Sequence, residues 1–157
     1  MHSNRSYLRL AAMTLLSFAA MYVLMYAMVD RLSNIYPNIN QAYMAALMAA
    51  PMVFIELGLM TSMYPNRKFN MLAIAIGAVV FVGSFAAIRD QSGIDDEQFL
   101  RSMIPHHAGA VLMCEQSSAR DPEIGRLCQS IISSQRAEID QMKELLAQHR
   151  RQQPDSR

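Results

Sequence analysis

Three long apolar runs constrain the fold of this chain more than any other feature of its sequence. They cover about residues 10–29, 42–63 and 69–88, and Glu56 is the one charged residue inside them. Each run has about the twenty residues that an α-helix needs to cross the hydrocarbon core of a bilayer. The first run is too long for the core of a signal peptide, and a second follows it closely. We therefore expect three retained transmembrane helices, with the lipid bilayer as their surroundings.

The rest of the chain has a different composition. Residues 1–88 contain five Lys/Arg and two Asp/Glu, whereas residues 89–157 contain nine and eleven. This contrast predicts a membrane domain at 1–88, a linker at 89–94, a soluble domain at 95–149 and a polar tail at 150–157. Neither part has the basic stripe that is typical of nucleic-acid-binding proteins, so we exclude that class of function.

Basic residues in the short flanks of the spans predict the orientation. Arg5 and Arg9 precede the first span, and Arg67 and Lys68 fill the turn between the second and third. The loop between the first two spans has a single arginine beside an aspartate. The positive-inside rule then places the N-terminus in the cytoplasm and the soluble domain on the opposite side. In a bacterial inner membrane, that side is the periplasm.

Glu56 is a candidate functional residue because an acidic side chain inside a span is costly in lipid. Four methionines wind along the helix beside it: Met48, Met52, Met60 and Met63. One interpretation is a proton or soft-metal relay, and the other is a protonated carboxyl packed against a neighbouring helix. We favour the second. Methionine is abundant, but ten of its 14 residues lie between Met13 and Met71, where it can simply fill gaps between helices.

Capping signals define two helices in the soluble domain. Asp95 followed by Gln98 resembles a capping box, and that helix is expected to end near residues 117–118. Asp121 is the expected N-cap of the second helix, with Pro122 at its first position. The domain is therefore predicted to be a helical hairpin, which makes the whole chain all-α.

Each helix of the hairpin carries one stripe at helical spacing. The stripes are Phe99, Met103, His107, Ala110 and Cys114, and Ile124, Cys128, Ile131, Gln135, Ile139, Met142 and Leu146. A short turn makes the helices antiparallel, so residues whose numbers sum to roughly 242 should face each other. Met103 then faces Ile139, and His107 faces Gln135. One hairpin cannot cover both stripes, so we expect a homodimer that completes a four-helix bundle.

The same pairing predicts that Cys114 faces Cys128 across the hairpin. An oxidising compartment would allow the two to form a disulfide. Two other interpretations stay open, namely small residues that ease close helix packing and a pair of soft copper ligands.

Pro105 is followed directly by His106 and His107. A proline inside a helix removes one backbone hydrogen bond, which here frees the carbonyl of Arg101. Adjacent helical residues diverge by about 100°, so the two imidazoles should not chelate one ion from a straight helix.

Methionines accompany both histidines. His107 shares the inner stripe with Met103, whereas His106 lies on the flank with Met113. Imidazole suits several metals, and thioether sulfur narrows the choice towards Cu(I). Two histidines on a helix are otherwise most often surface or capping residues, so spacing alone leaves both interpretations open.

The run from Phe99 to Met113, which contains Met-Ile-Pro-His-His, resembles the signature of the domain of unknown function 305 family. The segment Asp121-Pro-Glu-Ile, with Gln135, Glu138 and Met142 after it, resembles the second helix of that family. The similarity covers about residues 95–147. It implies a ferritin-like, typically extracytoplasmic helical domain with members tied to copper binding and resistance. Many relatives carry two such hairpins in tandem whereas this chain has one, which agrees with a homodimer.

Carried over position by position, the resemblance implies a set of metal ligands: His106, His107, Met103, Met113 and Met142. We expect His107 and Met103 to bind Cu(I) together with Met142 from the facing helix. His106 and Met113 would serve the flank, in a second site or towards a partner hairpin.

These observations lead to an expected function in copper handling. The chain would be a membrane-anchored Cu(I)-binding protein that acts as a chaperone, buffer or sensor outside the cytoplasm. The alternative is a non-catalytic structural or accessory subunit of a larger membrane complex. An enzyme ranks last, because the sequence offers no nucleophile with a base and orienter and no nucleotide loop.

Overall fold

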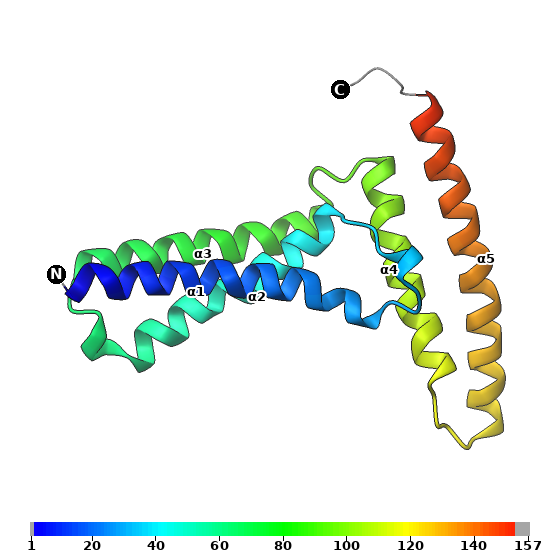
Figure 1. Cartoon of the computed structure of the whole chain (residues 1–157), viewed down its shortest axis with the longest axis horizontal. Helices are drawn as coiled ribbons and strands as arrows, with labels where there is room; N and C mark the ends of the chain where they lie inside the picture. Colours follow the sequence, from blue (N-terminus) through cyan, green and yellow to red (C-terminus); the bar gives the residue numbers. More distant parts are fainter. Residues whose placement is uncertain (1, 153–157) are drawn as a thin grey trace. The chain divides into compact units, whose positions relative to one another are not determined.

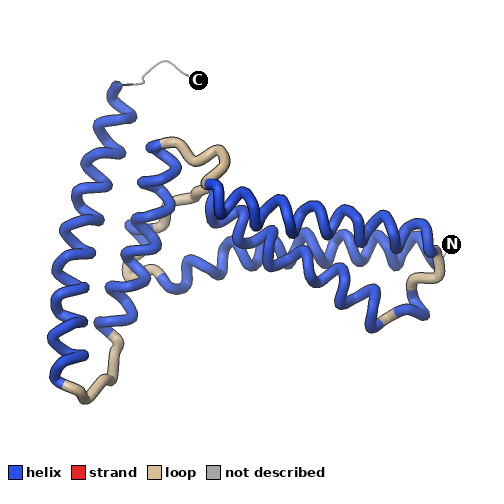
Figure 2. Tube along the Cα trace, turned by 180° about the vertical axis from the view of Figure 1, so that it is seen from behind, coloured by secondary structure: helices blue, strands red, loops and turns tan. Residues whose placement is uncertain are grey.

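The structure, a computed structural model, describes residues 2–152, with side chains from Arg5 onward. All regular structure in that part of the chain is helical (Figure 2). The long helices are α1 (His2–Leu24), α2 (Ile39–Leu59), α3 (Arg67–Asp90), α4 (Asp96–Glu115) and α5 (Pro122–Gln152), labelled in Figure 1. Short 3-10 turns cover Met25–Met28, Leu32–Asn34 and Thr61–Met63. The predicted all-α class is confirmed.

The chain divides into two compact units, each described here by itself. The membrane unit consists of residues 1–25 and 40–93, and the hairpin unit consists of residues 26–39 together with those from 94 onward. The expected linker at 89–94 lies where the units divide near residue 93. The assignment of residues 26–39 to the hairpin unit was not predicted, because the sequence indicated only the end of a span and a loop there.

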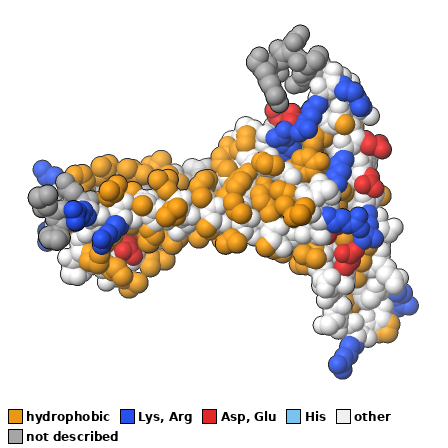
Figure 3. Space-filling view, viewed as in Figure 1, with side chains coloured by type: hydrophobic (Ala, Val, Ile, Leu, Met, Phe, Trp, Pro, Cys, Tyr) orange, Lys and Arg blue, Asp and Glu red, His pale blue; other side chains and the backbone are white. Residues whose placement is uncertain are grey.

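The membrane unit contains three helices that are long and apolar enough to cross a membrane, as predicted. Its surface is covered with hydrophobic side chains along most of its length, and Lys and Arg gather at one end (Figure 3). Few side chains are buried within the unit; the main cluster is Leu10, Val53, Leu57 and Tyr64. Such an inside-out distribution is compatible with helices whose outer face is in contact with lipid.

The span boundaries shift by a few residues from those expected. The side chain of Asn66 caps α3 by accepting hydrogen bonds from the backbone N–H groups of Lys68 and Phe69, at 3.0 and 3.3 Å. The helix therefore begins before the expected residue 69 and continues to Asp90. It ends where Gln91 adopts a left-handed conformation with φ of 49°.

Both predicted N-caps of the hairpin are confirmed. The carboxylate of Asp95 accepts a hydrogen bond from the backbone N–H of Gln98 at 2.7 Å, and Asp121 does the same for Glu123 at 2.7 Å. α5 continues to Gln152, so its helix enters the expected polar tail. The remainder of that predicted tail, residues 153–157, lies outside the described residues.

The buried face of α4 is rotated from the predicted stripe by about one residue. Seven side chains form the core of the hairpin unit: Leu100, Ile104, Ala108, Val111, Ile139, Met142 and Leu146. Phe99, expected to be inside, is 50% exposed. The cause is a second neighbour, because Val29 and Tyr36 from the segment 26–39 pack against the same core. This segment supplies part of the cover that was expected from another copy of the chain, and the homodimer stays a prediction.

Candidate metal centre

The proline turn of α4 is held from outside the helix. Pro105 has no N–H to donate to the carbonyl of Arg101. The side-chain N–H of buried Asn38, from outside the helix, lies 3.5 Å from that carbonyl oxygen. One residue on, the backbone N–H of Ile39 donates to Oε1 of Gln98 at 3.0 Å. The freed carbonyl was predicted from Pro105, but its partner was not. The segment 26–39 is thus attached to α4 one to two turns before the histidines.

His107 projects towards α5 and is largely buried, with its side chain 14% exposed. Its Nδ1 lies 3.3 Å from Oε2 of Glu138, which is ion-pair distance, but this buried nitrogen makes no hydrogen bond. The expected neighbour was Gln135, and no hydrogen bond joins these two side chains; Oε1 of Gln135 is itself buried without a partner. Sequence reasoning missed Glu138, although it lies one turn beyond Gln135 on the same helix.

The surroundings of His107 favour its neutral form. Burial lowers the pKa of the imidazole, and the neighbouring His106 lowers it further, while the carboxylate of Glu138 opposes both effects. Burial is the largest of the three contributions. A neutral imidazole is the form that can bind a metal ion.

The candidate methionines separate into inner and outer residues. Met142 is buried in the hairpin core, and half-buried Met103 packs against the same core. Met103 lies one turn before His107 on α4, and Met142 one turn after Glu138 on α5. Met113 is 58% exposed. The structure therefore collects Met103, His107 and Met142 along one helix interface and leaves Met113 outside it.

His106 is exposed, and its ring centroid lies 6.1 Å from that of His107 with the ring planes 58° apart. The two imidazoles diverge, as predicted for adjacent residues of a helix. Within residues 2–152, no group of three or more His, Cys, Asp or Glu side chains is arranged to hold a metal ion.

Cys114 and Cys128 face each other across the hairpin, as the pairing predicted. Both are half-buried and unbridged in the structure. The neighbouring thiol of Cys128 raises the pKa of Cys114, and burial adds to the effect. The facing geometry is what a disulfide would require, and the bridge itself stays a prediction.

Comparison with known proteins fits this geometry. A family model described as a domain of unknown function (DUF305) matches residues 84–156, which include both helices of the hairpin. A protein of Acanthamoeba polyphaga mimivirus, named uncharacterized protein L153, is 34% identical over 143 residues. The chain belongs to the DUF305 family. No solved structure matches it.

The viral relative also extends the similarity beyond the DUF305 hairpin. The alignment covers 89% of this chain and 92% of the relative. The family model covers only residues 84–156, so most of the membrane unit must be included in the alignment. The similarity to the viral protein therefore extends over most of the membrane unit as well as the hairpin.

Glu56 lies outside the DUF305 match, in α2 of the membrane unit. The hydroxyl of Tyr64 donates a hydrogen bond to its Oε1 at 3.0 Å, and Tyr64 is 3% exposed. Burial and this hydrogen bond raise the pKa of Tyr64, so the hydroxyl keeps its proton and remains a donor. The partner of Glu56 is thus a tyrosine from the following loop, where we expected a neighbouring helix.

Proposed function

We propose that this protein binds Cu(I) between α4 and α5 and acts as a membrane-anchored copper chaperone, buffer or sensor. The observation that carries the proposal is the buried Nδ1 of His107, which lacks a hydrogen bond. A buried polar atom without a partner costs about 1–3 kcal/mol, so it calls for an explanation. Binding of a metal ion would satisfy the lone pair of this nitrogen.

The donor set supports a soft monovalent metal. His107 offers a neutral imidazole, because burial lowers its pKa. Met103 and Met142 offer thioether sulfur at the same helix interface. Thioether and imidazole together suit Cu(I), whereas zinc sites recruit thiolate or carboxylate. Outer-shell carboxylates orient a metal-bound histidine through the ring nitrogen that does not bind the metal, so Glu138, which lies beside Nδ1, cannot have that role while Nδ1 binds copper.

The exposed donors support a function in transfer. His106 and Met113 lie on the outer flank of α4, one next to the buried histidine and the other nearly two turns further on. We infer that this flank receives Cu(I) or meets the hairpin of a second copy. Ile124 and Leu127, which are largely exposed near the hairpin turn, offer an apolar surface for such a homodimer.

The basic flanks support a location in the inner membrane of a bacterium. Arg5, Arg9, Arg67 and Lys68 would face the cytoplasm, with the hairpin in the periplasm. A reporter fused after Arg157 tests this orientation, since activity of a cytoplasmic reporter would reverse it.

A structural role is the alternative, and one observation favours it. His107 lies at ion-pair distance from Glu138, and Met142 is part of the hydrophobic core, so both can be explained by packing alone. The protein would then be a non-catalytic accessory subunit of a larger membrane complex. We propose no enzymatic activity for either case.

Competition against a Cu(I) chelator separates the two functions. Met103→Leu keeps the volume of the side chain and should leave the metal-free hairpin nearly as stable, yet weaken Cu(I) binding. His107→Ala should weaken it more, and acid should release the metal as the imidazole protonates. His149→Ala, a half-buried histidine near the end of α5, is the matched control. Equal affinity of wild type, Met103→Leu and His107→Ala would leave the accessory-subunit function as the explanation.

A further inference from the structure

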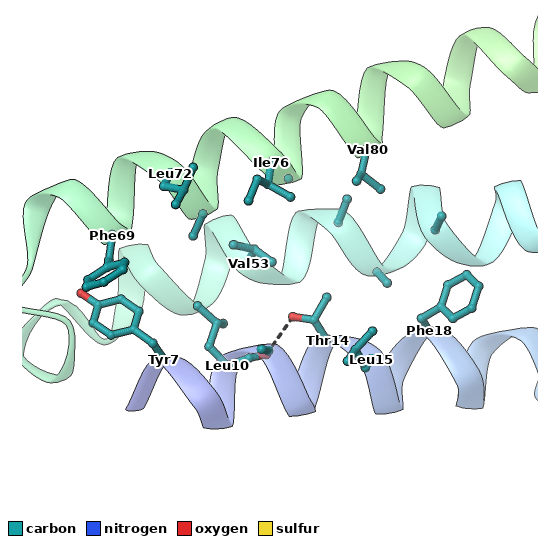
Figure 4. A pocket seen from close by; sticks show the side chains of 16 residues that line it. Tyr7, Leu10, Thr14, Leu15, Phe18, Val53, Phe69, Leu72, Ile76 and Val80 are labelled. Carbon is teal, nitrogen blue, oxygen red and sulfur yellow. Dashed lines mark hydrogen bonds between the residues drawn. The ribbon is translucent and has the colours of Figure 1, made fainter. Parts of the chain in front are cut away.

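An apolar groove runs along the membrane unit and is unrelated to the hairpin. α1 and α3 form its walls and α2 its floor, as Figure 4 shows. The groove measures about 490 Å³ and its lining is almost wholly apolar. Ala46, Ala49 and Ala50 lie along the floor, where their small side chains leave the space open. Leu72 and Ile76 line the α3 wall (Figure 4).

Two aromatic rings close one end of this groove. Tyr7 and Phe69 lie side by side there, with ring centroids 5.3 Å apart (Figure 4). The Tyr7 hydroxyl donates to Oδ1 of Asn70 at 2.7 Å and accepts from the backbone N–H of Asn66 at 3.2 Å. Apolar lining thus changes to polar hydrogen bonding at this end, as it does where a helix leaves the hydrocarbon core.

Four basic residues lie near the same end of the unit. Arg67 and Lys68 follow Asn66 at the start of α3, next to Phe69 of the groove, while Arg5 and Arg9 lie two residues before and after Tyr7, on the opposite face of α1. All four are exposed, and none forms an ion pair with a carboxylate among the described residues. A shallow, partly polar hollow lies beside them, lined by residues 65–68. The nearby carboxylate of Glu56 is already bonded to Tyr64.

We propose that the membrane unit binds an anionic phospholipid, with an acyl chain in the groove and the phosphate at Arg67 and Lys68, while Arg5 and Arg9 add to the positive charge of this end. The apolar groove and the cationic end are separate observations that one such molecule satisfies together. Basic pockets beside transmembrane helices bind anionic headgroups, each cation adding to the affinity. The positive-inside rule accounts for the charges alone but not for a groove that ends at them.

The size of the groove favours a lipid chain over a helix from a second copy. A helix with its side chains is about 10–12 Å across. The volume of this groove, about 490 Å³, is instead typical of sites that bind small molecules. A neutral lipid would fill the groove but leave the four cations without a counter-charge.

Native mass spectrometry of the full chain in detergent micelles tests the proposal. Phosphatidylglycerol and phosphatidylcholine with identical acyl chains are titrated in parallel, so only the headgroup charge differs. A micelle does not separate two compartments, so the effect of the basic residues on membrane orientation cannot influence the result. We expect one phosphatidylglycerol to be retained per chain, in preference to phosphatidylcholine, with the preference falling as salt is added.

Two variants separate the groove from the basic end. Ala46→Phe should fill the groove and reduce retention of both lipids, whereas Ala12→Phe, an exposed alanine outside the groove, should not. Arg67→Gln and Lys68→Gln should each reduce the preference for phosphatidylglycerol roughly five-fold and leave phosphatidylcholine unchanged. Arg89→Gln, at the other end of α3, is their control.

Three results would overturn the proposal. Equal retention of both lipids by the wild type would show that the basic residues do not select an anionic headgroup. Equal effects of Ala46→Phe and Ala12→Phe would show that the groove does not hold the acyl chain. A micellar dimer that retains no lipid would assign the groove to a second copy of the chain.

Discussion

The two units of this chain place their apolar side chains in opposite ways. Ile104 of the hairpin unit is 0% exposed, whereas Ile55 of the membrane unit is 58% exposed. Both residues lie in helices; Ile55 belongs to a predicted span, whereas Ile104 was not part of the inner stripe predicted for α4. The hairpin creates apolar surroundings by packing its helices, whereas the helices of the membrane unit are long and apolar enough to find them in lipid. Mean hydropathy therefore locates a helix in lipid, whereas periodicity is needed to locate a helix in a protein core.

The matched isoleucines give the largest expected difference. Ile104→Ala leaves a cavity in a closed core and should cost about 2–5 kcal/mol of stability in the hairpin unit. Ile55→Ala exchanges one lipid contact for another and should cost far less. Hydrogen exchange of α4 and α5 peptides measures the first, and that of α2 peptides measures the second. Equal losses of protection would mean that the membrane unit has a closed core as well.

The hairpin turn is the next place to test, because it is far from any membrane span in the sequence. If Cys114 and Cys128 form a disulfide in the cell, the bridge closes a loop of about fifteen residues and should contribute roughly 3 kcal/mol. Intact mass under non-reducing conditions, after alkylation, detects it directly. Reduction should then destabilise the wild type but leave Cys114→Ala unchanged. Two alkylated thiols in protein taken from its native compartment would exclude the bridge.

Asn38 tests the assignment of residues 26–39 to the hairpin unit. Its side chain donates to the carbonyl of Tyr36 at 3.0 Å and lies 3.5 Å from that of Arg101. Asn38→Ala leaves the carbonyl of Arg101 without this donor, whereas that of Tyr36 keeps the hydroxyl of Tyr26. The loss should cost about 1–3 kcal/mol, measured as faster exchange at residues 100–108. Asn40→Ala removes an exposed hydrogen bond to Gln91 within the membrane unit and is the control. Unchanged exchange in α4 of Asn38→Ala would separate the segment from the hairpin.

The sequence predicted the elements of both units but not this segment. Apolar runs identified three spans, and the caps at Asp95 and Asp121 were correct to the residue. The segment 26–39 has neither a long apolar run nor a helical period, so no local pattern indicates what it packs against. Its contact with α4 in turn rotated the buried face away from Phe99. Long-range packing of an irregular segment depends on shape, which periodicity does not record.

The candidate site was predicted only in part, because its contacts also depend on how two separate segments pack together. The pairing rule brought Cys114 to Cys128 near the turn, but it put Gln135 opposite His107 where the structure has Glu138. An offset of three residues is small for a rule anchored at Asp121, yet it exchanges an amide for a carboxylate. The chemistry of the site is therefore more sensitive to the pairing of the helices than the fold is.

The smallest expected effect concerns the pH dependence of the metal-free hairpin. Burial lowers the pKa of His107 below its ordinary value of 6.5, so the unfolded chain binds more protons than the folded one just below that pH. Stability should fall as the pH falls through 6.5 and level off below the folded pKa. Urea denaturation of protein prepared without metal, measured between pH 7.5 and 5, detects this slope. His107→Gln should remove its own part of the slope, and His149→Gln should keep it.

Glu138 supplies the sharper version of the same test. Its carboxylate raises the pKa of His107 and opposes the effect of burial. In Glu138→Gln that opposition is lost, so the pKa of His107 should fall further and the loss of stability in acid should become larger. If His107 instead formed a stabilising ion pair with Glu138, the slope of stability against pH would have the opposite sign. The protonated imidazole would then be the favoured form, and acid would stabilise the wild-type hairpin. The direction of the wild-type slope near pH 6 therefore decides whether His107 is kept neutral, which is the state that binding of Cu(I) requires.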